Sequence, residues 1–65
     1  MSREVIAFDD CEALKETDAA LLVTIEGEEV WVPKSQIDGS SDIQETDDTG
    51  TLVLNEWWAI EKGLV

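Results

Sequence analysis

The chain contains no histidine, one cysteine, one proline and only four basic residues. Without histidine it lacks the side chain used most often as a general base or metal ligand. The lone Cys11 has no partner for an internal disulfide, and a single thiol is typical of a reducing compartment. The first residues lack the apolar run of a signal peptide, and no stretch approaches the ~20 apolar residues of a membrane span. We therefore expect a cytoplasmic protein without a membrane segment.

Negative charge is what the chain has in excess. Sixteen Asp and Glu residues against four Lys and Arg residues give a formal net charge of −12. Because phosphates bind Lys and Arg, this composition disfavours direct binding to nucleic acid or to an anionic membrane. It favours a basic protein surface as partner. The alternatives are that the acidity serves solubility alone, or adaptation to high salt.

The length of 65 residues predicts a single domain over residues 1–65. A chain this short buries only roughly 60% of its unfolded surface, which leaves little room for a deep active site. Its hydrophobic content of 43% still predicts a folded core.

Alternating apolar residues predict strands in the first half of the chain. The predicted strands are Glu4–Phe8, Ala19–Glu26 and Glu29–Pro33. Gly27 predicts a tight turn between the last two, which form a β-hairpin. Asp9–Glu16 fits two interpretations: Asp9 and Glu12 resemble a helical capping box, but an extended Cys11–Glu16 closed by a turn at Thr17-Asp18 fits equally well.

The second half of the chain predicts shorter elements, with a helix at the end. These are a helical turn at Lys34–Ile37, a loop at Asp38–Ser41, a short polar strand at Asp42–Thr46, a turn at Asp47–Gly50, a strand at Thr51–Leu54 and a helix at Glu56–Lys62. Asn55 suits the N-cap of that helix, and Gly63 suits the position after its end. The predicted fold is mainly β (α+β): a small antiparallel sheet, or an SH3-like or OB-like barrel, of four or five strands with a short C-terminal helix.

Catalytic and metal-binding patterns are weak. Asp9, Asp10 and Glu12 flank Cys11, and their charges disfavour a reactive thiolate. The spacing of the carboxylates does not match a calcium-binding EF-hand loop. We expect a protein that is not an enzyme and has no cofactor and no metal site.

Acidic residues gather at the hairpin and in the segment before the last strand, which predicts a partner-binding surface. The candidates are Glu26, Glu28, Glu29, Asp42, Glu45, Asp47 and Asp48. Together with Asp38 they would place about eight negative charges over a small area if both regions lie on one side, in imitation of duplex DNA, which carries one charge per roughly 1.7 Å. An ordinary solvated face is the alternative.

Three tryptophans are the other conspicuous feature. Trp57 and Trp58 are about 100° apart on the predicted helix, so we expect one in the core and one exposed. We assign the partner contact to Trp58, since exposed tryptophans are enriched at the centres of interfaces. Trp31 is expected to pack against the terminal helix.

Two stretches, Ala20–Ile37 and Gly50–Leu64, resemble small acidic proteins of phages and prophages, with Trp31–Ile37 as the most specific part. The resemblance implies a host-cell setting in which such proteins often counter host defences, and some anti-CRISPR proteins imitate DNA. It implies an inhibitor of a host nucleic-acid-binding protein such as a CRISPR effector. The alternative is an accessory module of a phage replication or recombination complex. The oligomeric state stays open.

Overall fold

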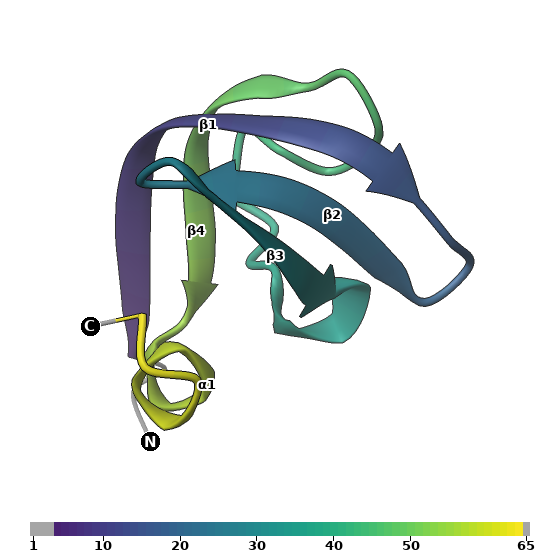
Figure 1. Cartoon of the computed structure of the whole chain (residues 1–65). Coiled ribbons are helices and arrows are strands. Elements are labelled where there is room, and N and C mark those ends of the chain that lie inside the picture. The colour runs from purple at the N-terminus through teal and green to yellow at the C-terminus, as the bar shows by residue number, and fades with distance from the viewer. Residues whose placement is uncertain (1–3, 65) are drawn as a thin grey trace.

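A computed structural model describes residues 4–64 and forms one antiparallel sheet with a short helix at its end (Figure 1). The elements are β1 (Val5–Glu16), β2 (Ala20–Ile25), β3 (Glu28–Pro33), a 3₁₀ turn η1 (Lys34–Gln36), β4 (Thr49–Asn55) and α1 (Glu56–Glu61). The strand order is β3-β2-β1-β4. The sheet is open, so of the two predicted architectures the small antiparallel sheet is the one adopted.

The long first strand resolves the ambiguity at Asp9–Glu16 in favour of the extended form. Cys11 and Ala13 are buried on one face of β1, as an alternating strand requires. The register shifts twice, at β-bulges that begin after Phe8 and after Ala13, and Asp10 takes a left-handed φ of 57° at the first bulge. The bulges bend β1, so its first half pairs mainly with β4 and its second half with β2 (Figure 1).

The β2–β3 hairpin is confirmed. Ile25 and Glu28 form its last pair, and the two residues between them, Glu26 and Gly27, have φ values of 51° and 84°. Two positive φ values in a two-residue turn are the pattern of a type I′ turn, whose twist matches that of the strands.

The prediction of a short polar strand at Asp42–Thr46 is wrong. This stretch is an irregular loop, because side chains take the hydrogen bonds that a strand partner would supply. The Asp48 carboxylate accepts from the N–H groups of Gln44, at 2.9 Å, and Glu45, at 3.0 Å. Ile43 is nevertheless fully buried, as a loop anchored in the core.

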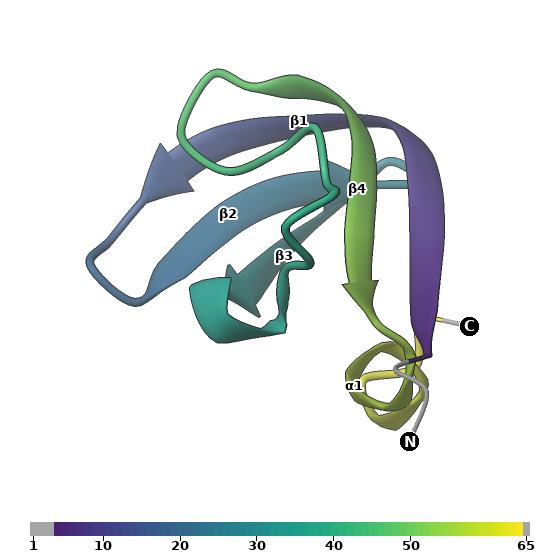
Figure 2. The same cartoon turned by 180° about the vertical axis from the view of Figure 1, so that it is seen from behind.

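The segment that joins β3 to β4 covers the outer edge of β4 and crosses one face of the sheet (Figure 2). Ile37 forms an isolated bridge with Leu54. The Ser41 hydroxyl accepts from the Val53 N–H at 3.1 Å. The core lies between this segment, the sheet and α1, and its largest fully buried side chains are Leu21, Val23, Val32, Ile43, Leu52 and Leu54. We call the opposite face of the sheet its outer face.

The helix ends follow the sequence prediction. The Asn55 side chain accepts from the Trp57 N–H at 3.2 Å, as an N-cap does. Gly63 has a φ of 76°, and the Leu64 N–H donates to the Ala59 carbonyl at 2.9 Å. This is a Schellman motif, and Leu64 supplies the accompanying apolar contact by packing against the core.

Candidate functional site: an acidic outer face

The predicted acidic residues fall into two groups. We call Glu26, Glu28 and Glu29 the hairpin group, and Asp42, Glu45, Asp47 and Asp48 the loop group. The loop group is fixed beside β1: the Asp47 N–H donates to the Ala13 carbonyl, and the Ala13 N–H donates to the Asp48 carbonyl, both at 2.9 Å. The hairpin group lies on the far side of β1, at the turn between β2 and β3.

Glu12 connects the two groups across the sheet. It pairs with Thr24 on one side and with Thr49 on the other, and Thr24 pairs with Glu29. The row Glu29–Thr24–Glu12–Thr49 therefore spans all four strands, and Thr49 directly follows Asp48. Neighbouring strands are about 4.8 Å apart, so Glu12 and Glu29 lie roughly 10 Å from each other.

Glu12 and Glu29 both point to the outer face. Both are exposed, whereas Ala13 and Val23 in the next row are buried in the core. The Thr24 hydroxyl accepts from the Glu12 N–H at 3.2 Å and holds the two strands together at this row. The sequence did not indicate Glu12, because its position depends on the strand pairing.

Two members of the loop group act within the fold. The Asp42 carboxylate accepts from the Thr51 N–H at 3.1 Å, at the start of β4. Asp48 holds the loop through Gln44 and Glu45, as described above. The remaining carboxylates of the two groups, and that of Glu12, take part in no ion pair or side-chain hydrogen bond within residues 4–64. They belong to Glu12, Glu26, Glu28, Glu29, Glu45 and Asp47. These six are available to a partner.

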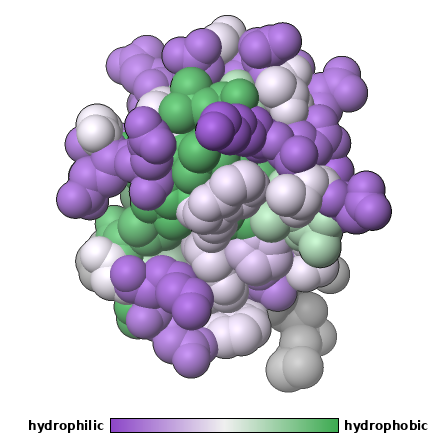
Figure 3. Space-filling view, turned by 45° about the vertical axis from the view of Figure 1, so that its right-hand side comes forward, coloured by the Kyte–Doolittle hydropathy of each residue, from purple (hydrophilic) through white to green (hydrophobic). Residues whose placement is uncertain are grey.

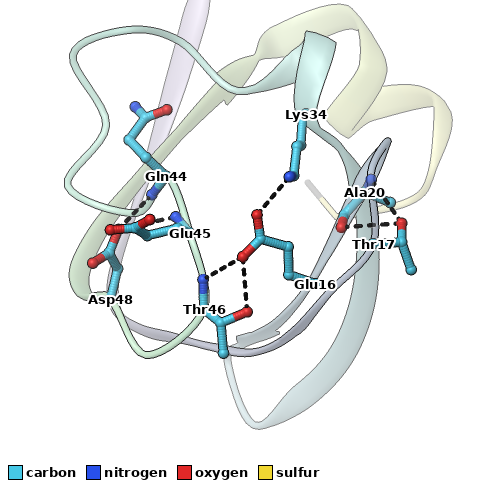
Figure 4. A network of polar contacts seen from close by, with 8 residues as sticks. All are labelled: Glu16, Thr17, Ala20, Lys34, Gln44, Glu45, Thr46 and Asp48. Carbon is cyan, nitrogen blue, oxygen red and sulfur yellow. Dashed lines mark hydrogen bonds and ion pairs between the residues drawn. The ribbon is translucent and has the colours of Figure 1, made fainter.

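Glu16 fastens the end of β1 to the two segments opposite it (Figure 4). Its carboxylate contacts the Lys34 ammonium at 2.6 Å and accepts from the Thr46 N–H and hydroxyl at 3.2 and 3.1 Å. The Lys34 bond, followed by the two Thr46 bonds, lowers the pKa of Glu16 from 4.5 to about 2. One of the four basic residues is thus used for structure.

The tryptophans require two corrections. Trp58 is only 7% exposed and belongs to the core, so the expectation that Trp58 is the exposed tryptophan is wrong, and its contact with a partner stays a prediction. Trp57, 57% exposed, is the tryptophan that α1 presents to solvent. The phase of the helix relative to the sheet decides between them, and the sequence does not specify that phase. Trp31 lies on the outer face opposite Leu22 of β2, not against α1, and is 48% exposed.

Cys11 is a core residue. It is 2% exposed, and its thiol donates to the Phe8 carbonyl at 3.4 Å. Burial raises the pKa of the Cys11 thiol, and the carboxylates of Asp10, Asp9 and Glu26 raise it further. Both effects disfavour the thiolate.

A small hollow lies beside η1. It measures about 90 Å³, below the roughly 300–1,000 Å³ of pockets that enclose drug-sized ligands. Its lining consists of Val5, Ser35, Gln36, Ile37, Asp38 and Asn55. Within the described residues, no three His, Cys, Asp or Glu side chains are placed to share a metal ion. The same part of the chain has no helix long and apolar enough to cross a membrane.

No protein-family model, curated protein or solved structure matches the chain significantly. The resemblance to small acidic phage proteins therefore stays a prediction. On the face seen in Figure 3, hydrophilic side chains form a broad margin around an apolar area.

Proposed function

We propose that this domain is a non-enzymatic inhibitor that binds a basic, nucleic-acid-binding protein, such as a CRISPR effector, in the place that DNA would occupy. The observation that carries the proposal is the row from Glu29 to Glu12 on the outer face, which continues to Thr49 and so ends directly beside Asp48 of the loop group. A groove lined with Lys and Arg attracts such a surface as it attracts phosphates.

The net charge of −12 supports the same proposal. It speeds encounter with a basic groove and repels nucleic acid, so the domain would compete with DNA and not join it in a ternary complex. The sheet fixes the backbone of Glu12 and Glu29, so binding has to order only their side chains, which limits its entropic cost.

A DNA-displacement assay tests the proposal. Purified nucleic-acid-binding complexes, including CRISPR effectors, are loaded with fluorescent duplex DNA and titrated with the domain, and DNA release is followed by anisotropy. We expect release at low salt that weakens as salt rises. The triple variant Glu12→Gln, Glu28→Gln and Glu29→Gln should release DNA at least tenfold less effectively.

The matched control neutralises three carboxylates elsewhere, Asp18→Asn, Glu56→Gln and Glu61→Gln. These lie in the β1–β2 turn and on α1. Both variants lose the same formal charge, so only position distinguishes them. Equal activity of the two variants would show that net charge, not the position of these three carboxylates on β1 and β3, is responsible. Binding without DNA release would contradict the proposal.

A second candidate function uses the apolar surface of α1. Trp57 and Ile60 are 57% and 56% exposed and lie three residues apart, on one side of the helix. This favours an accessory module that binds a phage replication or recombination protein through an apolar contact. It predicts binding that depends little on salt and is lost with Trp57→Ala.

A further inference from the structure

The outer edge of β3 has no partner strand in the described part of the chain. β3 is the last strand of the sheet on its side, whereas segment 37–43 covers the free edge of β4. In an antiparallel ladder, alternate residues turn their N–H and C=O groups away from the neighbouring strand. The edge therefore carries unpaired backbone groups that another strand can use.

The register identifies those groups. The pair Ile25 and Glu28 closes a two-residue turn, which makes it a hydrogen-bonded pair. The bond from the Lys34 N–H to the Ala19 carbonyl, at 2.8 Å, continues the same alternation at the other end of the hairpin. The residues between, Glu29 and Trp31, consequently turn their N–H and C=O groups outward.

The side chains along this edge specify what a docked strand would carry. On the outer face, Glu29 and Trp31 stand two residues apart, about 7 Å along the strand. An arginine beside them would pair with the carboxylate and stack on the indole. Val30 faces the core side and is only half-buried, so an apolar residue of the added strand would cover it.

We propose that the β3 edge binds an extended basic segment of the partner, in which arginine alternates with an apolar residue. The segment adds a strand to the sheet, with its arginines beside Glu29 and Trp31 and its apolar residues over Val30. This rests on the proposed function in one respect: it takes the partner to be a basic protein.

Charge selects this occupant over a second copy of the chain. Two copies paired along β3 would bring together two domains of net charge −12, each with the exposed Glu28 and Glu29 on that strand. Charged residues on an edge strand oppose such self-pairing. Pro33 has no N–H, so it limits the ladder at the end of β3. A basic segment removes the repulsion.

A peptide experiment tests the edge directly. The probe is a short capped peptide of alternating arginine and valine, and the control has the same composition with the arginines and valines in separate blocks. Amide exchange measured by NMR should show the N–H groups of Glu29 and Trp31 protected by the alternating peptide. The block peptide should bind at least tenfold more weakly.

Two variants examine the contacts separately. Trp31→Thr keeps a strand-forming residue and removes the indole, whereas Glu29→Pro removes both the carboxylate and an outward N–H that the domain itself does not use. Each should weaken peptide binding at least tenfold, and Trp57→Ala, which removes the other exposed tryptophan, should leave it unchanged. Thermal melts identify any variant that fails to fold, and the amide-exchange result on the native chain then decides. Protection elsewhere, equal binding of both peptides, or dimerisation through β3 would overturn the edge proposal.

The two proposals fail in different ways. If Trp31→Thr displaces DNA as well as the native chain does, while the triple amide variant does not, the edge proposal is wrong and the inhibitor proposal stands. If the alternating peptide binds at β3 but no nucleic-acid-binding protein is bound, the inhibitor proposal is wrong and the edge is a site for another basic partner.

Discussion

Glu16 shows how a single residue holds an open sheet together. Its carboxylate joins the end of β1 to Lys34 of η1 and to Thr46 of the loop before β4. These segments are 18 and 30 residues from it in sequence. The contacts bind the charged form of the carboxyl group, which is why its pKa falls.

Stability should therefore depend on the ionisation of Glu16. Its pKa is lowered on folding from 4.5 to about 2, so its contribution is fully present above pH 4.5 and is lost as pH falls to about 2. We expect Glu16→Gln to lower the melting temperature at pH 7 and the difference from the native chain to disappear near pH 2. The control, Glu61→Gln, removes one charge from α1. A difference that persists unchanged at pH 2 would exclude ionisation as its cause.

In the turn between β2 and β3, the residue type at position 26 does not suit the backbone conformation. Glu26 has a φ of 51°, which costs an ordinary L-residue roughly 1–2 kcal/mol, whereas asparagine tolerates it. We expect Glu26→Asn to stabilise the domain by up to about 1 kcal/mol, since it relieves part of that cost, and the gain should appear as a higher urea midpoint with an unchanged slope. Glu26→Gln removes the same charge without favouring the turn. If both variants gain equally, charge and not backbone conformation is the cause.

The sequence predicted those elements that have a local signal. Apolar alternation located β2 and β3, Gly27 located their turn, and Asn55 located the start of α1. The loop at Asp42–Thr46 has no such signal, because its conformation depends on side-chain bonds within the segment between β3 and β4. The bulge at Asp10 is also unmarked, since an aspartate with positive φ is not recognisable from the sequence alone.

At the scale of the whole molecule, strand order decided how much of the site could be predicted. The acidic residues at the hairpin and before β4 are visible in the sequence as clusters. Glu12 joins them only because β1 lies between β2 and β4, and Trp31 lies beside Leu22 only through the register of β3 with β2. Neither fact follows from composition or periodicity, which specify faces and not neighbours.

The charge of the whole domain makes its stability dependent on salt. The molecule measures 32 × 22 × 18 Å. At 0.01 M salt the Debye length is about 30 Å, so nearly all its charges repel one another, whereas at 1 M the length is about 3 Å and repulsion is confined to close neighbours.

Raising NaCl from 0.01 to 1 M should therefore stabilise the domain. We expect a gain of about 1–2 kcal/mol, which for a chain of this size is a rise in melting temperature of roughly 4–16 °C. The triple variant Glu12→Gln, Glu28→Gln and Glu29→Gln reduces the negative charge of the domain, from a formal net charge of −12 to −9. Its melting temperature should therefore rise less with NaCl. Differential scanning calorimetry of both chains, with sucrose as the uncharged comparison, separates screening from general solute effects. A melting temperature independent of NaCl would mean that the fold already tolerates its charge, and the carboxylates would then impose little strain for a basic partner to relieve.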